Sequence, residues 1–169
     1  KNVIVIPKNY DKNKKYPVIY LLHGHGGNHA TWITRTRPDL LDEVTRLGVI
    51  AVCPDAENSW YVDSPVDPSY KYETYVTKEL IPFVDKKYST VASPKGRAVT
   101  GFSMGGYGGL WLGINHPDLF GACGSMSGGT DILPYSQRWN LNKRFGSYKE
   151  HPEVFEKFNL MDQVHLKIG

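Results

Sequence analysis

The sequence predicts an α/β fold in which a mostly parallel sheet carries helices on both faces. Two observations support this prediction. Continuous apolar runs, such as Val18 to Leu22 and Val49 to Cys53, are typical of strands that are buried on both faces. Segments with apolar residues at helical spacing alternate with these runs, which indicates βαβ units with right-handed crossovers. The 169 residues suffice for one domain with its own core, spanning residues 1–169.

The first half of the chain contains three expected strands, a glycine-rich loop and a helix. Pro38 to Leu47 is predicted to be helical because its leucines and Val44 share one face, proline suits its first turn and Gly48 can end it. The other expected elements are strands at Val3 to Ile6, Val18 to Leu22 and Val49 to Cys53, a polar turn at Asn9 to Lys15, and the loop His23 to His29.

The second half continues the alternation. Lys71 to Tyr88 is predicted to be a long helix that Pro82 should kink. The remaining expected elements are a loop at Asn58 to Ser69, strands at Ala98 to Thr100 and Ala122 to Ser127, an irregular stretch at Asp131 to Gly146, a helix at Pro152 to Phe158, and the first residues of a strand at Leu166 to Ile168.

Composition narrows the classes of function. The net charge is only +3 and the basic residues are scattered, which argues against a nucleic-acid partner. We find no run long enough to span a membrane and no signal peptide, although a chain that begins at Lys1 leaves room for an upstream segment. Cys53 and Cys123 are expected to be two buried free thiols. A soluble protein with a small-molecule substrate is expected, while its compartment and oligomeric state stay open.

The most informative motif is Gly101-Phe102-Ser103-Met104-Gly105. It follows an apolar strand and precedes a helical pattern, so the serine lies on a sharp strand-to-helix turn. This arrangement is typical of a nucleophile elbow, in which the flanking glycines avoid a collision of Cβ atoms with the turn. We therefore predict that Ser103 is a catalytic nucleophile. The alternative is a glycine-rich turn with an incidental serine.

The carboxyl ends of parallel strands meet at one edge of a sheet, and ligands bind there. Ser103 and the loop His23 to His29 both lie at this edge. The amides of Met104 and His25 are therefore candidates for an oxyanion hole that stabilises a tetrahedral intermediate. The alternative, that His23, His25 and His29 bind a metal, lacks a matching carboxylate nearby, so no metal or cofactor is expected. We expect the side chain of His23 to tie the loop to its neighbours.

Further segments resemble one known family in combination: Tyr16 to Gly24, Glu79 to Pro82, Gly101 to Gly109, His116 to Phe120 and Ser125 to Gly129. The chain resembles the Putative esterase family of α/β-hydrolases, which includes S-formylglutathione hydrolases, feruloyl, acetyl xylan and tributyrin esterases, and mycolyltransferases. The resemblance implies an α/β-hydrolase fold and hydrolysis of a carboxylic ester or thioester. It assigns Ser103 as the nucleophile and the amides of Met104 and His25 as the oxyanion hole.

The resemblance also implies that Ser59 to Ser64 lies near the substrate. Trp60 and Tyr61 in this loop are candidates to line an aromatic acyl pocket, although aromatic loop residues often only cover the core. The ester's acyl and alcohol groups are not readable from the sequence, and an aromatic or a carbohydrate-linked ester is compatible with it.

The catalytic acid and histidine are the main gap. A serine needs a histidine base, and in this fold the order is serine, acid, histidine. The resemblance implies that both follow strands after Leu166, so we expect them beyond Gly169 and regard the chain as truncated. Weaker internal candidates are Asp131 and the pair Asp162 and His165; His116 and His151 are expected to have other roles. A non-catalytic binding module, a histidine from a second chain, and acyl transfer at the same site remain as alternatives.

Overall fold

The computed structural model describes the backbone of residues 1–167 and the side chains of residues 1–163. A five-stranded sheet of order β1-β3-β2-β4-β5 forms its centre. Three of the pairings are parallel, and β1 pairs with β3 in the antiparallel direction. The strands are β1 (Asn2–Val5), β2 (Val18–Leu22), β3 (Ile50–Pro54), β4 (Arg97–Gly101) and β5 (Ala122–Cys123). The predicted mostly parallel α/β fold is therefore confirmed.

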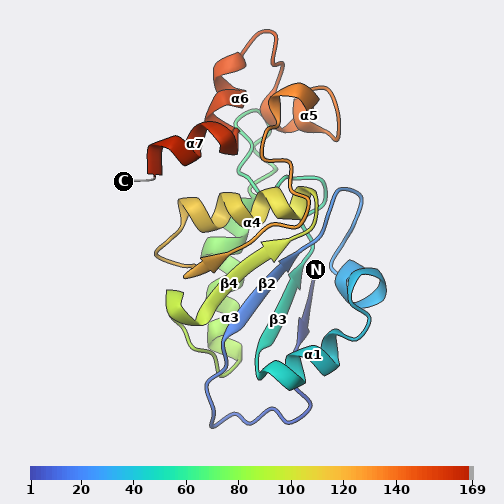
Figure 1. The fold of residues 1–169 in the computed structure, drawn as a ribbon, viewed down its shortest axis with the longest axis vertical. Helices are drawn as coiled ribbons and strands as arrows, with labels where there is room; N and C mark the ends of the chain where they lie inside the picture. The colour runs from blue at the N-terminus through green and yellow to red at the C-terminus, as the bar shows by residue number, and fades with distance from the viewer. Residues whose placement is uncertain (168–169) are drawn as a thin grey trace.

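Helices cover both faces of the sheet, and α5, α6 and α7 lie beyond the carboxyl ends of the strands (Figure 1). The α-helices are α1 (Leu40–Leu47), α2 (Tyr72–Thr74), α3 (Ile81–Lys87), α4 (Met104–Asn115), α5 (Leu141–Phe145), α6 (Pro152–Phe158) and α7 (Leu160–Lys167). Two π-helical segments, η1 (Trp32–Thr36) and η2 (Tyr75–Leu80), and two short 3₁₀ turns, η3 (Pro94–Gly96) and η4 (Leu133–Tyr135), complete the fold. None of the helices within residues 1–167 has the length and apolarity needed to cross a membrane.

The two faces of the sheet have separate cores because side chains alternate along each strand. Tyr20 and Leu22 of β2 join a large core with α4, α3 and the helices beyond the sheet, whereas Leu21 packs into a smaller core with α1. In β3, Val52 faces the large core and Cys53 the small one. The continuous apolar runs of these strands thus reflect burial on both sides, as the sequence predicted.

Several predicted elements lie close to their expected positions. Helix α6 has the bounds that the sequence indicated, and α1 ends at Gly48, which adopts a left-handed conformation with a φ of 65°. The long helix expected between residues 71 and 88 is divided into α2, η2 and α3. Pro82 lies in the first turn of α3 and cannot donate to the carbonyl of Lys78, and the π-helical segment η2 lies directly before it.

Three predictions at the C-terminal side are wrong. The strand expected over residues 122–127 is only two residues long, followed by a single bridge between Phe102 and Met126. Because β5 is an edge strand, Cys123 is exposed rather than buried, while Cys53 is buried and burial raises its pKa to about 12. Residues 166–167 belong to helix α7 instead of beginning a strand, because a short apolar run does not distinguish the two structures. Ile168 lies outside the described residues.

Helix α4 lies so close to the sheet that two positions admit only glycine. A Cβ atom on Gly105 would lie 2.2 Å from the carbonyl oxygen of Leu22 in β2. A Cβ atom on Gly101 would lie 2.3 Å from the carbonyl oxygen of Gly105. The obstructing atoms belong to the backbone of a strand and a helix, so they cannot move aside without disturbing the sheet. These contacts confirm the predicted steric role of the two glycines.

We predict that Gly105→Val lowers the free energy of unfolding of the full-length protein by roughly 3 kcal/mol or more, because a side chain there forces α4 away from β2. Gly129→Ala is the matched control, since its Cβ would meet nothing closer than the Trp60 ring at 3.8 Å. Urea denaturation followed by circular dichroism measures both variants. Equal stability of the two variants would contradict the assigned contact.

Candidate active site

Ser103 lies on a strained turn between β4 and α4. Its φ of 55° and ψ of −116° are rare for a residue with a side chain, and such strain is concentrated at functional sites. Hydrogen bonds hold the turn on both sides: the Ser103 amide donates to the Met126 carbonyl at 2.8 Å, and the Tyr107 amide donates to the Ser103 carbonyl at 3.1 Å. The hydroxyl is half-buried and has no hydrogen-bond partner among the described residues.

Two backbone donors border this serine. The loop after β2 approaches it so closely that a Cβ atom on Gly24 would lie 3.4 Å from the Cβ atom of Ser103. The amide of His25, the next residue, has no acceptor among residues 1–163, and neither does the amide of Met104. Met104 is also the first residue of the twelve-residue helix α4, where the helix dipole favours negative charge. The two amides predicted as an oxyanion hole thus have no hydrogen-bond acceptor in the described part of the chain.

His23 is buried and fixes the loop. The Ala56 amide donates to its Nε2 at 3.0 Å, so Nε2 is an acceptor and Nδ1 carries the proton, which it donates to the Gly24 carbonyl at 2.7 Å. The hydroxyl of Tyr61 donates to the His23 carbonyl at 2.9 Å. These contacts agree with the expectation that the His23 side chain holds the loop to its neighbours. Burial is the main cause that lowers the pKa of His23, which keeps the ring neutral.

The three loop histidines have different hydrogen-bond partners, but the expectation that no carboxylate lies near them is wrong, because Asp55 lies 3.0 Å from His29 and 3.9 Å from His23. His25 Nε2 lies 2.8 Å from the side-chain oxygen of Asn140, and His29 Nδ1 lies 3.0 Å from a carboxylate oxygen of Asp55. Both nitrogens of His23 are engaged by the backbone. Within the described residues, no three histidine, cysteine or acidic side chains come together in a way that could hold a metal ion.

A cavity of 370 Å³ opens above Ser103, within the size range of small-molecule sites. Trp60 lines it, as predicted. Tyr61 does not: its side chain is completely buried, and its ring packs against Gly108 of α4. The expectation that Tyr61 lines a substrate pocket is therefore corrected, because its hydroxyl is used to hold the His23 loop. The residues around the cavity are Gly24, His25, Trp60, Phe102, Ser103, Ser127, Gly129, Asp131, Ile132, Tyr135, Trp139 and Leu141.

Tyr135 and Trp139 form an aromatic wall of the cavity that the sequence did not predict. Tyr135 and Trp139 lie with ring centroids 5.2 Å apart and are 41% and 47% exposed. Trp139 adopts a φ of 49°, and its carbonyl accepts a hydrogen bond from the Trp60 indole at 2.9 Å. This wall belongs to the stretch that was expected to be irregular. Two aromatic residues in a polar segment were the only available signal, and they do not reveal which surface they face.

No histidine with a described side chain forms a hydrogen bond to Ser103, although His25 lines the same cavity. His116 pairs with Glu73 at 2.6 Å and His151 with Glu153 at 3.1 Å, in addition to the three loop histidines. The side chain of His165 lies outside the described residues. Asp131 lines the cavity. The carboxylate of Asp162 accepts from Asn159 at 3.0 Å.

The sheet order, the parallel core strands and the serine turn between β4 and α4 define the chain as an α/β-hydrolase. The model of the family described as "Putative esterase" matches residues 1–166, and the chain belongs to this family.

Three similar proteins illustrate the family. An esterase of Mycobacterium tuberculosis is 35% identical over 130 residues, which cover 74% of this chain and 28% of the relative. An endo-1,4-beta-xylanase/feruloyl esterase of Xylanibacter ruminicola is 31% identical over 126 residues, covering 70% of this chain and 17% of the relative. The solved structure of a ferulic acid esterase has a TM-score of 0.69 and 35% identity, and the match covers 78% of this chain and 53% of that structure.

The chain therefore spans only part of its relatives, from 17% of the xylanase/feruloyl esterase to 53% of the solved esterase.

We predict that the neutral state of His23 makes stability depend on pH. In the folded state the pKa of His23 lies below its ordinary value of 6.5. At a pH between the folded and the unfolded pKa of His23, the unfolded chain therefore binds more protons than the folded protein does. The free energy of unfolding should be fully retained above pH 6.5 and fall below it, by up to about 1.4 kcal/mol per pH unit. Urea denaturation between pH 5 and 8 should show a smaller slope in His23→Gln. An unchanged slope would show that His23 titrates normally.

Proposed function

We propose that this chain carries the nucleophile of a serine hydrolase that cleaves carboxylic esters or thioesters through an acyl-enzyme at Ser103. One observation carries the proposal: a strained turn presents an unpaired hydroxyl to a cavity that His25 also lines, and the backbone amides of His25 and of Met104, the residue after the serine, have no acceptor within the described residues. Membership of an esterase family supports the same reaction type. A serine held in this way for structural reasons alone would not require free donors beside it.

In the proposed reaction, Ser103 is the nucleophile and the two amides stabilise the negative charge that forms during attack. The Ser103 oxygen attacks the carbonyl carbon of the substrate while a histidine takes its proton. The C=O double bond opens, and the negative charge that forms on the carbonyl oxygen is held by the amides of His25 and Met104, each worth roughly 3 kcal/mol of barrier. The bond to the alcohol or thiol breaks, the histidine protonates the leaving group, and water then hydrolyses the acyl-enzyme by the reverse sequence of proton transfers.

The histidine is proposed to come from chain outside residues 1–169, together with the acid that orients it. The described histidines support this proposal, because each has another hydrogen-bond partner and none of them bonds to the Ser103 hydroxyl. The relatives are also longer than this chain. The test of activity must therefore use the protein encoded by the complete reading frame.

The substrate is proposed to carry an aromatic acyl group. Trp60, Tyr135 and Trp139 give the cavity flat apolar walls, against which an aromatic ring buries its faces. The Trp60 indole is already hydrogen-bonded to the Trp139 carbonyl, so this wall is held in place before a ligand arrives. The feruloyl esterase among the relatives and the solved ferulic acid esterase support this choice.

We predict that Ser103→Ala abolishes turnover of p-nitrophenyl acetate and of methyl ferulate by the full-length protein, with little loss of stability. A fluorophosphonate probe should modify wild-type protein at Ser103, as identified by peptide mass spectrometry, and should not modify the variant. Ser127→Ala is the control, because Ser127 lines the same cavity away from the turn. Folded wild-type protein that forms no Ser103 adduct would refute the proposal.

We predict that Trp139→Ala raises KM for methyl ferulate about tenfold and leaves KM for p-nitrophenyl acetate nearly unchanged, because only the aromatic acyl group reaches this wall. Phe83→Ala is the matched control, since Phe83 is 48% exposed and does not line the cavity. A parallel rise of KM for both esters would place Trp139 outside the acyl site.

A further inference from the structure

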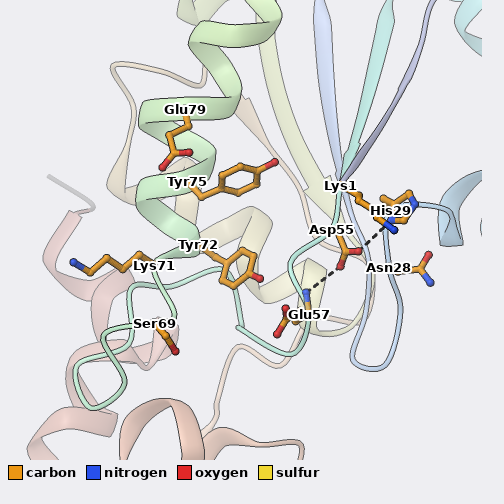
Figure 2. A pocket seen from close by; sticks show the side chains of 10 residues that line it. All are labelled: Lys1, Asn28, His29, Asp55, Glu57, Ser69, Lys71, Tyr72, Tyr75 and Glu79. Carbon is orange, nitrogen blue, oxygen red and sulfur yellow. Dashed lines mark hydrogen bonds and ion pairs between the residues drawn. The ribbon is translucent and has the colours of Figure 1, made fainter.

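A second cavity, of 640 Å³, is lined in part by Asn28 and His29 of the loop after β2 (Figure 2). Its residues are Lys1, Asn28, His29, Asp55, Glu57, Ser69, Lys71, Tyr72, Tyr75 and Glu79. None of them lines the cavity above Ser103. Four separate parts of the chain form it: Lys1 before β1, the loop after β2, the loop after β3, and the helical segment that begins at α2.

Carboxylates on one side of this cavity are held in fixed positions. Asp55 receives hydrogen bonds from His29 at 3.0 Å and from the Glu57 amide at 3.3 Å (Figure 2). These bonds lower the pKa of Asp55, although its partial burial alone would raise it. Glu57 has a φ of 47°, and its carboxylate accepts from the Tyr70 hydroxyl at 2.8 Å. A strained backbone and a buttressing hydroxyl thus orient this side chain at the cavity.

Tyrosines form the opposite side. Tyr72 and Tyr75 extend from the helical segment toward the side that carries Asp55 (Figure 2), with ring centroids 6.1 Å apart in an edge-to-face arrangement. Burial and the neighbouring Glu57 raise the pKa of Tyr72 to about 12, so its hydroxyl is a neutral donor. Tyr75 begins the π-helical segment η2, and such segments are frequent at functional sites. Aromatic faces therefore adjoin hydrogen-bond acceptors within one cavity.

The charges of the lining argue against an ion as the ligand. An anion would meet the carboxylates of Asp55, Glu57 and Glu79, whereas a simple cation would meet the ammonium groups of Lys1 and Lys71. A neutral molecule with many hydroxyl groups is compatible with both the carboxylates and the ammonium groups of the lining. Each hydroxyl can donate a hydrogen bond to a carboxylate and accept one from an ammonium group or a phenol. Sugar rings add an apolar C–H face that packs on tyrosine.

We propose that this cavity is a saccharide-binding site, separate from the ester site, in which Tyr72 and Tyr75 contact the sugar ring while Asp55 and Glu57 accept hydrogen bonds from its hydroxyls. The ligand class is a neutral oligosaccharide. Asn28 and His29 place the bound sugar against the same loop that carries His25. Binding here involves no bond making, so it does not depend on the chemistry proposed for Ser103.

Isothermal titration calorimetry of the full-length protein with xylohexaose, cellohexaose and maltohexaose tests the proposal. We expect saturable binding of at least one of them, weakened about tenfold or more by Tyr72→Ala. Glu57→Ala, at an exposed loop position, should weaken binding in the same direction and keeps the test decisive if Tyr72→Ala does not fold. Glu153→Ala on α6 is the matched control and should bind as the wild type does.

Three outcomes would overturn the proposal. The first is no saturable binding of any of the three hexasaccharides up to about 10 mM, the range in which weak carbohydrate contacts are still measurable. The second is binding that survives Tyr72→Ala and Glu57→Ala but is lost in Tyr135→Ala, which would place the sugar in the cavity above Ser103. The third is saturable binding of spermidine or inorganic phosphate in place of the hexasaccharides.

Discussion

The contact between the backbone of α4 and the backbone of β2 is the constraint on which the site depends. With glycine at position 105, the helix rests directly on the carbonyl of Leu22, and Gly101 brings β4 equally close. A helix that starts this near to the strands leaves the connecting residue no relaxed conformation, which explains the φ of 55° at Ser103. The strain is tolerated because the surrounding sheet and helix are buried and paired. The position of the serine is thus a consequence of packing rather than of any bond to its side chain.

The loops around the serine are rigid for a different reason. His23 is held neutral by burial and uses both ring nitrogens on backbone partners, while Tyr61 holds the same residue by its carbonyl. The segment that supplies these partners contains left-handed residues at positions 57, 60 and 61. One side of this segment borders the ester cavity through Trp60, and the other borders the second cavity through Glu57. The same strained loop therefore lines both cavities, Trp60 in the cavity above Ser103 and Glu57 in the second cavity.

Patterns formed by residues close together in sequence predicted much of the fold and the turn that carries Ser103. Predictions that depend on neighbouring residues in sequence agree with the structure. They include the strands β2 and β3, the bounds of α6 and the close packing of the glycines around Ser103. The failures involve information that is not local. Burial of Cys123 depended on whether another strand covers β5, and a run of three residues could not distinguish a strand from the end of α7. Similarly, nothing in the loop sequence indicated that Trp60 faces the cavity while Tyr61 faces the core.

The groups proposed for the reaction lie in short local segments of sequence, whereas the groups proposed to bind the acyl group come from distant segments. The groups proposed for bond breaking, Ser103 and two amides, lie in short glycine-rich segments whose geometry is set by close packing. The aromatic wall joins Trp60 to Trp139 across 79 positions of sequence through one indole-to-carbonyl hydrogen bond. Tyr135 and Trp139 are the exposed part of this wall and can change without altering the contact between α4 and β2, whereas Trp60 is buried and packs edge-to-face on Tyr107 of α4. The exposed part of the wall can therefore vary while the turn and the two amides stay the same.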